Sequence, residues 1–266
     1  DKGLSFATVL QEAQRLGYAE ADPTFDVEGV DAAHKLSIMS AIAFGNSMSF
    51  EQAHIEGIRQ LDPADIRNAE QLGYRIKLLG ITKRTLEGVE LRVHPTLIPA
   101  KRLIANVEGA MNAVLVKGDA VGATLYYGKG AGAEPTASAV IADLVDVTRM
   151  HTADPEHRVP HLAFQPDAMV DLAILPISEV VSSYYLRLRV EDRPGVLADV
   201  TRILADDGIS IVAMIQREPG EGEEQTNIIM LTHKTVEPNI DAALAGIEAL
   251  PAVKGRIIRL RLEELL

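Results

Sequence analysis

A lysine and several carboxylates gather in one short stretch near the start of the chain. Residues 17–35 read GYAEADPTFDVEGVDAAHK, with Glu20, Asp26 and Asp31 preceding Lys35. Carboxylates can hold a substrate ammonium group, and a lysine has a proton to give to a reacting oxygen. Because Asp31 and Lys35 are four residues apart on a predicted helix, they share a face of it. On spacing alone, an acidic surface loop beside an ordinary helix ion pair is the commoner explanation.

A glycine-rich turn is the second candidate site. The stretch GKGAGAEPTAS begins at Gly128, includes Gly132 and precedes a predicted helix over 135–150. Glycine permits close backbone approach, and a helix N-terminus favours an anion such as a pyrophosphate. The stretch lacks the full GxGxxG pattern, so a tight strand-to-helix turn explains it equally well.

A third candidate lies in the segment EDRPGVL, which joins a predicted strand to a predicted helix. Gly195 would let a ligand approach the backbone, and the free amides at Val196 and Leu197 could bind a carboxylate. Asp192 in the same loop could take an ammonium group. The pattern therefore fits a site for a zwitterionic amino acid, although an ordinary strand-to-helix loop fits it as well.

Periodicity and turn residues predict the elements that position these candidates. In the first half we expect helices that alternate with paired strands. A helix over 6–16 is closed by Gly17, the loop 18–29 follows it, and Ser49 with Gln52 has the spacing of a capping box. The other predicted helices cover 31–44 and 62 to about 73, and the predicted strands cover 75–83, 89–93, 112–117 and 123–127.

The second half predicts a separate small domain after a proline-rich linker. Residues 184–190 alternate as a strand, and 196–207 carry an apolar helical stripe. Two strands, a helix and a final strand follow at 209–217, 225–233, 240–250 and 258–262. The order βαββαβ is that of a ferredoxin-like sandwich, so the fold class is α+β. Such a domain leaves an edge strand open, which favours pairing across a dimer.

Composition excludes several classes of function. The formal net charge of −12 argues against nucleic-acid binding, and the absence of Trp argues against a base-stacking platform. There is no Cys for a disulfide or thiolate metal site, and no apolar run long enough to span a membrane. His157 and His161 are four apart, but Pro160 between them argues against a helical metal site, so we expect no metal. These features favour the cytoplasm.

The motif at residues 17–35, with Ala13 before it, resembles the homoserine dehydrogenase signature throughout its length. RIKLLGI, VEGAMNAVLVKGD and GAGAEPTASAVIADL are similar to the same family in the same order. The segment VEDRPGVLADVTRILADDGISI resembles the opening of ACT domains, which bind amino acids as regulators. The chain is thus identified as a homoserine dehydrogenase substrate domain followed by an ACT domain.

The resemblance implies a reaction and roles for the first group of residues. The family reduces L-aspartate 4-semialdehyde to L-homoserine with NADPH or NADH, on the route to threonine and methionine. By resemblance, Lys35 gives a proton to the aldehyde oxygen, and Asp31 positions the substrate and that lysine. Glu20 matches a residue that grips the amino end of the substrate, with Asp26 and Tyr18 in the same pocket.

The resemblance also implies parts outside these residues. Gly132 matches a position beside the nucleotide, although Lys129 stands where many members have proline. The family's nucleotide-binding domain would precede Asp1. We therefore expect a catalytic domain over 1–150, with 128–150 returning to the missing nucleotide domain. A linker over 151–181 and a regulatory domain over 182–266 would follow.

Partners and rival functions follow from the same resemblance. The implied partners are the small-molecule substrate, an amino-acid effector, for which threonine is our expectation, and further copies of the chain in a homodimer or homotetramer. We expect no nucleic acid and no membrane. The alternatives are a regulatory amino-acid-binding fragment with no activity by itself and another ACT-bearing enzyme such as a phosphoglycerate dehydrogenase. Neither alternative needs the acid-rich motif that ends in Lys35.

Overall fold

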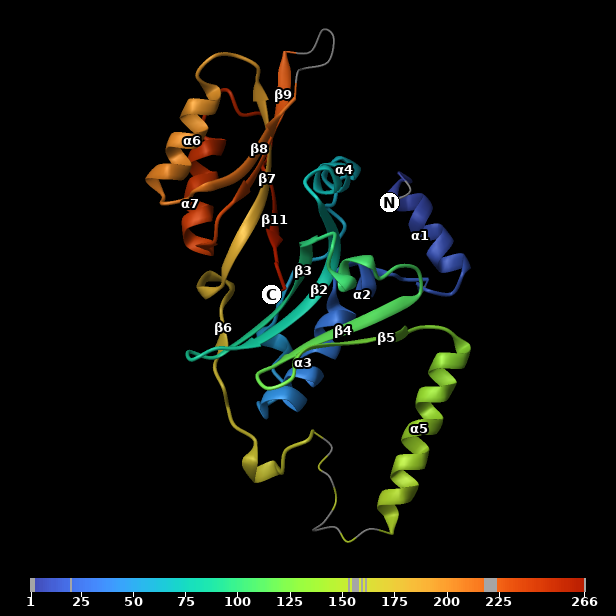
Figure 1. Ribbon diagram of the computed structural model, residues 1–266. Coiled ribbons are helices and arrows are strands. Elements are labelled where there is room, and N and C mark those ends of the chain that lie inside the picture. Colours follow the sequence, from blue (N-terminus) through green and yellow to red (C-terminus); the bar gives the residue numbers. More distant parts are fainter. Residues whose placement is uncertain are drawn as a thin grey trace.

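The structure is a computed structural model of the 266-residue chain. It describes residues 3–19, 21–152, 154, 158, 160, 162–217 and 224–265. Figure 1 shows two regions, one around α3 and the hairpin of β2 with β3, and one in which α6 and α7 cover a sheet. The chain is α+β, as predicted.

Helix α3 (Val30–Phe44) packs on a long antiparallel hairpin in the first region. The hairpin consists of β2 (Tyr74–Arg84) and β3 (Val89–Pro99), and the short strand β1 (His54–Ile55) lies parallel to β3. The buried face of α3 places Ala33 and Leu36 against β3. This packing holds α3 against the β2–β3 hairpin.

Two further helices, α1 and α4, belong to the first region, and a short helix, α2, precedes α3. Helix α1 (Phe6–Arg15) begins at Ser5, whose hydroxyl accepts a hydrogen bond from the Thr8 amide, and it has no buried residue. Helix α4 (Pro63–Gln71) begins at Asp62, whose side chain accepts from the Ala64 amide at 2.7 Å, as an Asp-Pro start predicts. The expected loop 18–29 contains one short helix, α2 (Thr24–Val27).

The expected helix at Ser49 is wrong. The structure has only a 3-10 turn over Phe50–Gln52, and Ser49 makes no cap there. Its hydroxyl donates instead to the Ser47 carbonyl at 3.1 Å. The chain has to enter β1 two residues later, so tertiary pairing outweighs the local capping signal.

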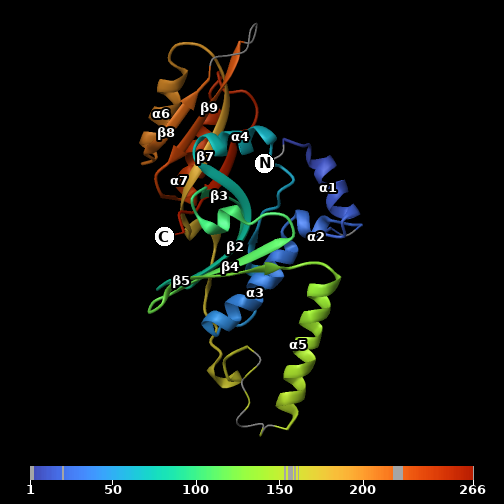
Figure 2. The same ribbon diagram turned by 45° about the vertical axis from the view of Figure 1, so that its right-hand side comes forward.

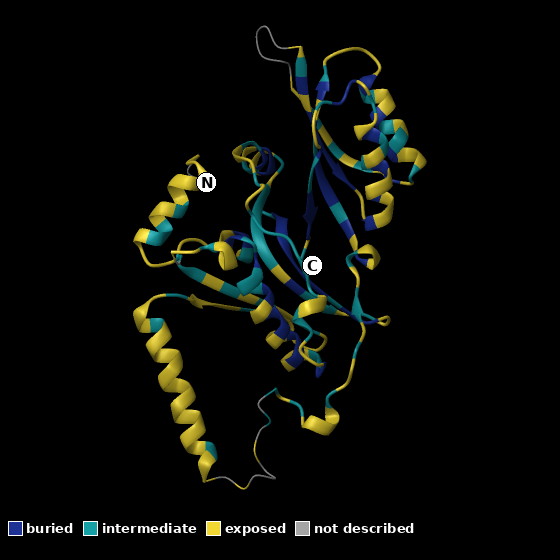
Figure 3. Ribbon diagram, turned by 180° about the vertical axis from the view of Figure 1, so that it is seen from behind, coloured by how far each residue is buried: buried dark blue, intermediate teal, exposed yellow. Residues whose placement is uncertain are grey.

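A second hairpin projects from the core and leads to a long exposed helix. Strands β4 (Met111–Gly118) and β5 (Gly122–Lys129) form a two-stranded sheet, and α5 (Ala133–His151) follows the glycine-rich turn. Helix α5 has no buried residue, and Figure 3 colours most of it as exposed. Its exposed apolar side chains are Val140, Ile141, Leu144, Val145 and Val147.

The second region has the predicted βαββαβ order. Strand β7 (Val181–Glu191) leads to α6 (Val196–Asp206), then β8 (Ile211–Gln216) and β9 (Gln225–Thr232) precede α7 (Glu237–Glu248) and β11 (Ile258–Leu262). The strands lie in the order β11-β7-β9-β8, all antiparallel. The two helices cover one face, where Leu186, Leu188 and Val190 are buried in the core.

The two regions share one sheet. Strand β11 pairs in parallel with β3 at Thr96 and Leu97, so β11 is not an open edge. The described part of the chain therefore contains one nine-stranded sheet, which also includes β6 (Ile174–Leu175) and β10 (Thr235–Val236). Helix α4 covers the second face of the sheet in the second region, where Ala69 contacts the core around Tyr185. Figure 2 shows α4 beside β7 from a second angle.

The remaining segments are short. Strand β6 pairs in parallel with β3 at Val89 and Glu90, after a 3-10 turn over Pro166–Ala168, and another turn over Ile177–Glu179 leads into β7. A further 3-10 turn covers Leu103–Asn106 after β3. In the described parts of the chain, no helix is both long enough and apolar enough to cross a membrane.

Candidate functional site

Asp31 and Lys35 form an ion pair on the exposed face of α3. Lys35 Nζ lies 2.5 Å from Asp31 Oδ2, one helical turn away. The Lys35 side chain is 68% exposed and that of Asp31 is 43% exposed, so both are open to a ligand that approaches this face. A carboxylate beside an ammonium group orients it.

The start of α3 rests on close backbone contacts. Gly29 precedes the helix with φ of +79°, a conformation that favours glycine. A Cβ on Gly29 would lie 3.1 Å from a methyl of Val93 and 3.5 Å from the Glu56 carbonyl. A Cβ on Gly57 would lie 2.6 Å from the Val27 carbonyl oxygen. The backbone that follows the Glu56 Cα is therefore packed against the turn from which α3, with Asp31 and Lys35, begins.

The other expected substrate residues lie just before this helix. Asp26 is exposed in α2, which packs against α3, and Tyr18 is 48% exposed after α1. Glu20 lies outside the described residues, as do His157 and His161. The structure thus brings Asp26 near the start of α3 in the fold.

One feature near Lys35 was not expected from the sequence. The His34 ring stacks parallel to Phe50 at a centroid distance of 3.9 Å and to Phe25 at 6.3 Å. Aromatic residues at positions 25 and 50 carry no periodic signal that would have joined them to His34. The stack links α2, α3 and the turn before β1.

Gly132 lies in a different part of the fold, at the N-terminus of α5. Its φ is +116°, and the residue is exposed, with Pro135 as the nearest side chain at 3.6 Å from a built Cβ. The space where a side chain would stand at Gly132 is therefore open apart from Pro135.

The loop between β7 and α6 contains the residues that the sequence predicts to bind an amino acid. Gly195 precedes α6 with φ of +94° and open space around it, and Asp192 is exposed with an Oδ1 atom 3.4 Å from Gln216 Nε2. The Val196 side chain is buried and the Leu197 side chain packs against the core. Those two residues can therefore offer a ligand only their backbone amides.

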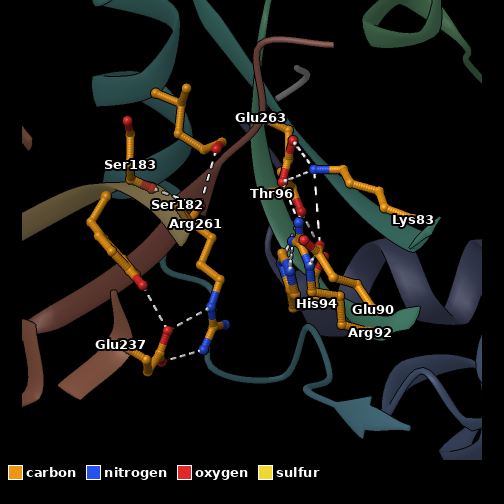
Figure 4. Close-up of polar contacts among 12 residues, drawn as sticks. Lys83, Glu90, Arg92, His94, Thr96, Ser182, Ser183, Glu237, Arg261 and Glu263 are labelled. Carbon is orange, nitrogen blue, oxygen red and sulfur yellow. Dashed lines mark hydrogen bonds and ion pairs between the residues drawn. The ribbon is translucent and has the colours of Figure 1, made fainter. Parts of the chain in front are cut away.

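A buried polar cluster joins the two regions, and the sequence did not signal it (Figure 4). On one side, Arg92 contacts Glu263 and donates to Glu90 at 3.0 Å, while Lys83 Nζ lies 3.0 Å from Glu263. Arg92 is 1% exposed. Each of these charges has an opposite partner, as buried charges require. The partners come from β2, β3 and the end of β11, so their proximity depends on the parallel pairing of β3 with β11.

A second set of contacts in the cluster is centred on Arg261 of β11. Its Nη1 donates to Glu56 at 2.9 Å and its Nη2 donates to Glu237 at 2.5 Å. Tyr184 donates its hydroxyl proton to Glu237 at 2.7 Å. Burial alone would raise the pKa of Glu56, but His54 and the guanidinium of Arg261 outweigh burial and lower it to about 2.

His94 lies between the two sets of contacts. Burial, followed by the charges of Arg261 and Arg92, holds the pKa of His94 well below its usual value of 6.5. The ring is therefore neutral, and its Nε2 accepts a hydrogen bond from Arg92 at 2.7 Å. Its Nδ1 lies 2.9 Å from the Thr96 hydroxyl.

Comparison with known proteins assigns both regions. The homoserine dehydrogenase family model matches residues 1–145, which include the Asp31–Lys35 pair, and the ACT domain model matches residues 184–252. The chain belongs to the homoserine dehydrogenase family. This assignment sets aside an ACT-bearing enzyme of another family.

Individual relatives agree over the whole chain. It is 59% identical over 265 residues to a homoserine dehydrogenase of Pseudomonas aeruginosa, covering 100% of this chain and 61% of that protein. It is 58% identical to the one of Neisseria gonorrhoeae, again over 61% of that protein. The crystal structure of a Thiobacillus denitrificans homoserine dehydrogenase matches with a TM-score of 0.92 at 70% identity, over 100% of this chain and 60% of that one. The chain thus spans about three fifths of the relatives' length.

Proposed function

We propose that the protein to which this chain belongs reduces L-aspartate 4-semialdehyde to L-homoserine with NADPH or NADH, in the cytoplasm. The observation that supports this most directly is the exposed ion pair of Lys35 and Asp31 on α3, within the stretch that matches the family. The whole reaction consumes one aldehyde, one reduced nicotinamide and one proton. It yields one alcohol and one oxidised nicotinamide.

The residues of this chain would act on the substrate side. NADPH or NADH, when bound, supplies the hydride that reaches the aldehyde carbon. Lys35 gives the proton from its Nζ to the aldehyde oxygen, and Asp31 holds that Nζ in place. Glu20, Asp26 and Tyr18 hold the amino end of the substrate. Such binding in both ground and transition states acts mainly on KM.

The nucleotide would touch this chain mainly at the start of α5. Gly132, with its open surroundings and the free amides that follow it, fits a phosphate-bearing group. We propose that 128–150 packs on a nucleotide-binding domain in the part of the relatives' length that this chain lacks. That docking would cover the apolar side chains of α5.

We propose that the C-terminal region senses threonine. Asp192 would take the ammonium group of the amino acid, and the amides at Gly195, Val196 and Leu197 would take its carboxylate. Because β11 is already paired, β8 is the ACT edge left for pairing across a homodimer or homotetramer. We place the catalytic domain at 1–150, the linker at 151–181 and the regulatory domain at 182–266.

The test is an assay of the full-length protein for homoserine-dependent reduction of NADP and NAD. We expect turnover, and we expect none from the 266-residue chain alone, because hydride transfer needs the cofactor held against the substrate. Turnover by the chain alone would contradict the placement of the cofactor site. A full-length protein that binds threonine but does not oxidise homoserine would favour a regulatory amino-acid-binding protein.

A further inference from the structure

The segment from His54 to Arg59 connects the C-terminal region to the start of α3. Strand β1 pairs with β3, and the Glu56 amide donates to the Val93 carbonyl at 2.8 Å. Two residues later, the Ile58 amide donates to the Val27 carbonyl at 2.8 Å. The segment is therefore bound to the sheet at one end and to the α2–α3 turn at the other.

Glu56 is the charged residue of this segment that contacts the C-terminal region, where it binds Arg261 of β11. Its Oε1 accepts from Arg261 Nη1 at 2.9 Å and lies 2.8 Å from His54 Nε2. Arg261 is only 2% exposed, and Glu237 at the start of α7 binds the rest of its guanidinium. A guanidinium fixed at several nitrogens is a rigid anchor for the carboxylate it binds.

The contacts beyond Glu56 pack the segment closely against the α2–α3 turn. The missing side chain of Gly57 lets its backbone touch Val27 and Glu28, since a Cβ there would lie 2.6 Å from the Val27 carbonyl and from a Glu28 carboxylate oxygen. The Glu56 carbonyl is in ordinary contact with Gly29, 3.5 Å from where a Cβ would lie. A shift of Glu56 therefore moves the turn from which Asp31 and Lys35 take their direction.

We propose that Glu56 is a positioning residue for the Asp31–Lys35 pair and that Arg261 of the ACT region holds it in place. The C-terminal region then supports Asp31 and Lys35 through the Arg261–Glu56 ion pair and the contacts at Gly57 and Gly29. The catalytic part of this inference rests on the proposed function.

The test uses the full-length enzyme with Glu56→Gln and a matched control, Glu263→Gln. Glu263 is also buried at the junction and binds Arg92 and Lys83 there, but the contacts described for it do not involve the segment 54–59. We expect Glu56→Gln to lower kcat by about 10- to 100-fold, the cost of a small misplacement of reacting groups. KM should change by less than about threefold, because substrate binding groups remain. The kcat of the control, Glu263→Gln, should stay within about twofold of that of the wild type at temperatures where both variants are folded.

Hydrogen exchange of the peptide over residues 24–35 gives a readout that does not need activity. Glu56→Gln should speed exchange there, and Arg261→Lys should do the same, with the double variant no worse than either single one. Unchanged exchange in Glu56→Gln, or equal acceleration in Glu263→Gln, would overturn the inference. If the wild type lacked dehydrogenase activity, the proposed function would fail. The exchange comparison would still decide whether Glu56 and Arg261 hold the segment that carries Asp31 and Lys35 in place.

Discussion

Arg187 of β7 and Asp65 of α4 form an ion pair between the two regions, with Arg187 Nε 2.6 Å from Asp65 Oδ1. Asp65 is fully buried and also accepts the hydroxyl proton of Tyr185 at 2.8 Å. Removing one partner of such a pair leaves a charge without compensation. The pair therefore fixes α4 against the ACT sheet.

Asp65→Ala should lower the free energy of unfolding by about 3 kcal/mol, because Arg187 and the Tyr185 hydroxyl lose their main partner. Urea unfolding measures it. Asp206→Ala, an exposed acid at the end of α6, is the control and should change stability by less than about 0.5 kcal/mol. Equal effects in the two variants would mean that the buried pair contributes little.

Lys35→Ala in the full-length enzyme should lower kcat by about 10²–10⁴-fold if the lysine gives the proton to the aldehyde oxygen. The control is Lys101→Ala, which removes an exposed lysine in the turn after β3. Steady-state kinetics in both reaction directions check the result. A Lys35→Ala enzyme with kcat near that of the wild type would assign the proton donor elsewhere.

His94 should make stability depend on pH below neutrality. Its pKa is depressed in the folded state, so the unfolded chain takes up a proton first as pH falls through 6.5. The free energy of unfolding then falls with decreasing pH, by at most about 1.4 kcal/mol per pH unit for one proton. Urea unfolding at several pH values between 7.5 and 5 gives the free energy of unfolding as a function of pH. For His94→Gln this free energy should depend less steeply on pH than for the wild type. Exposed His233→Gln serves as the control, and a wild-type slope in His94→Gln would contradict the prediction.

The proposed threonine site has a natural pair of control positions. Gly195 and Gly208 flank α6, both have positive φ, and a Cβ at either would meet nothing within 4 Å. Alanine at either position therefore adds similar backbone strain of about 1 kcal/mol. In calorimetric titrations of the full-length protein, Gly195→Ala should weaken threonine binding about tenfold. Gly208→Ala should bind as the wild type does.

Asp192→Ala tests the other half of the same site. Loss of the carboxylate should remove the ammonium contact and weaken threonine binding by about tenfold or more. Binding that survives both Asp192→Ala and Gly195→Ala would place the amino acid elsewhere. Absence of heat at about millimolar threonine in the wild type would leave the ACT region with a structural role only.

Local signals predicted most of the elements, and the failures have a common cause. Asp62-Pro63 and the alternation of 184–190 determine their elements through adjacent residues, so they were predicted correctly. Ser49 failed because β1 pairing, a contact distant in sequence, outweighs its capping signal. The continuous sheet could not be predicted, because alternation identifies a strand but not its neighbour.

In the candidate site, too, residues that are close in sequence could be predicted and contacts between distant residues could not. Asp31 and Lys35 could be paired from helical spacing alone. The supports beneath them could not, because Glu56 and Arg261 are 205 positions apart and charges in strands usually face water. His34 carried no signal either, since its stacking partners lie on other elements.

The parallel pairing of β11 with β3 also determines the order in which parts of the sheet can form during synthesis of the chain. Arg92 and Glu263, which meet beside this pairing, are 171 positions apart, so the β3 edge is synthesised long before its covering strand. At about 5–20 residues per second, the growing chain exposes that edge for many seconds. Contacts so distant in sequence also form slowly because a long loop must close first. The α3 region therefore completes its sheet only after the last strand of the C-terminal region has been made, and until then the part of the β3 edge at Thr96 and Leu97 lacks the strand that covers it.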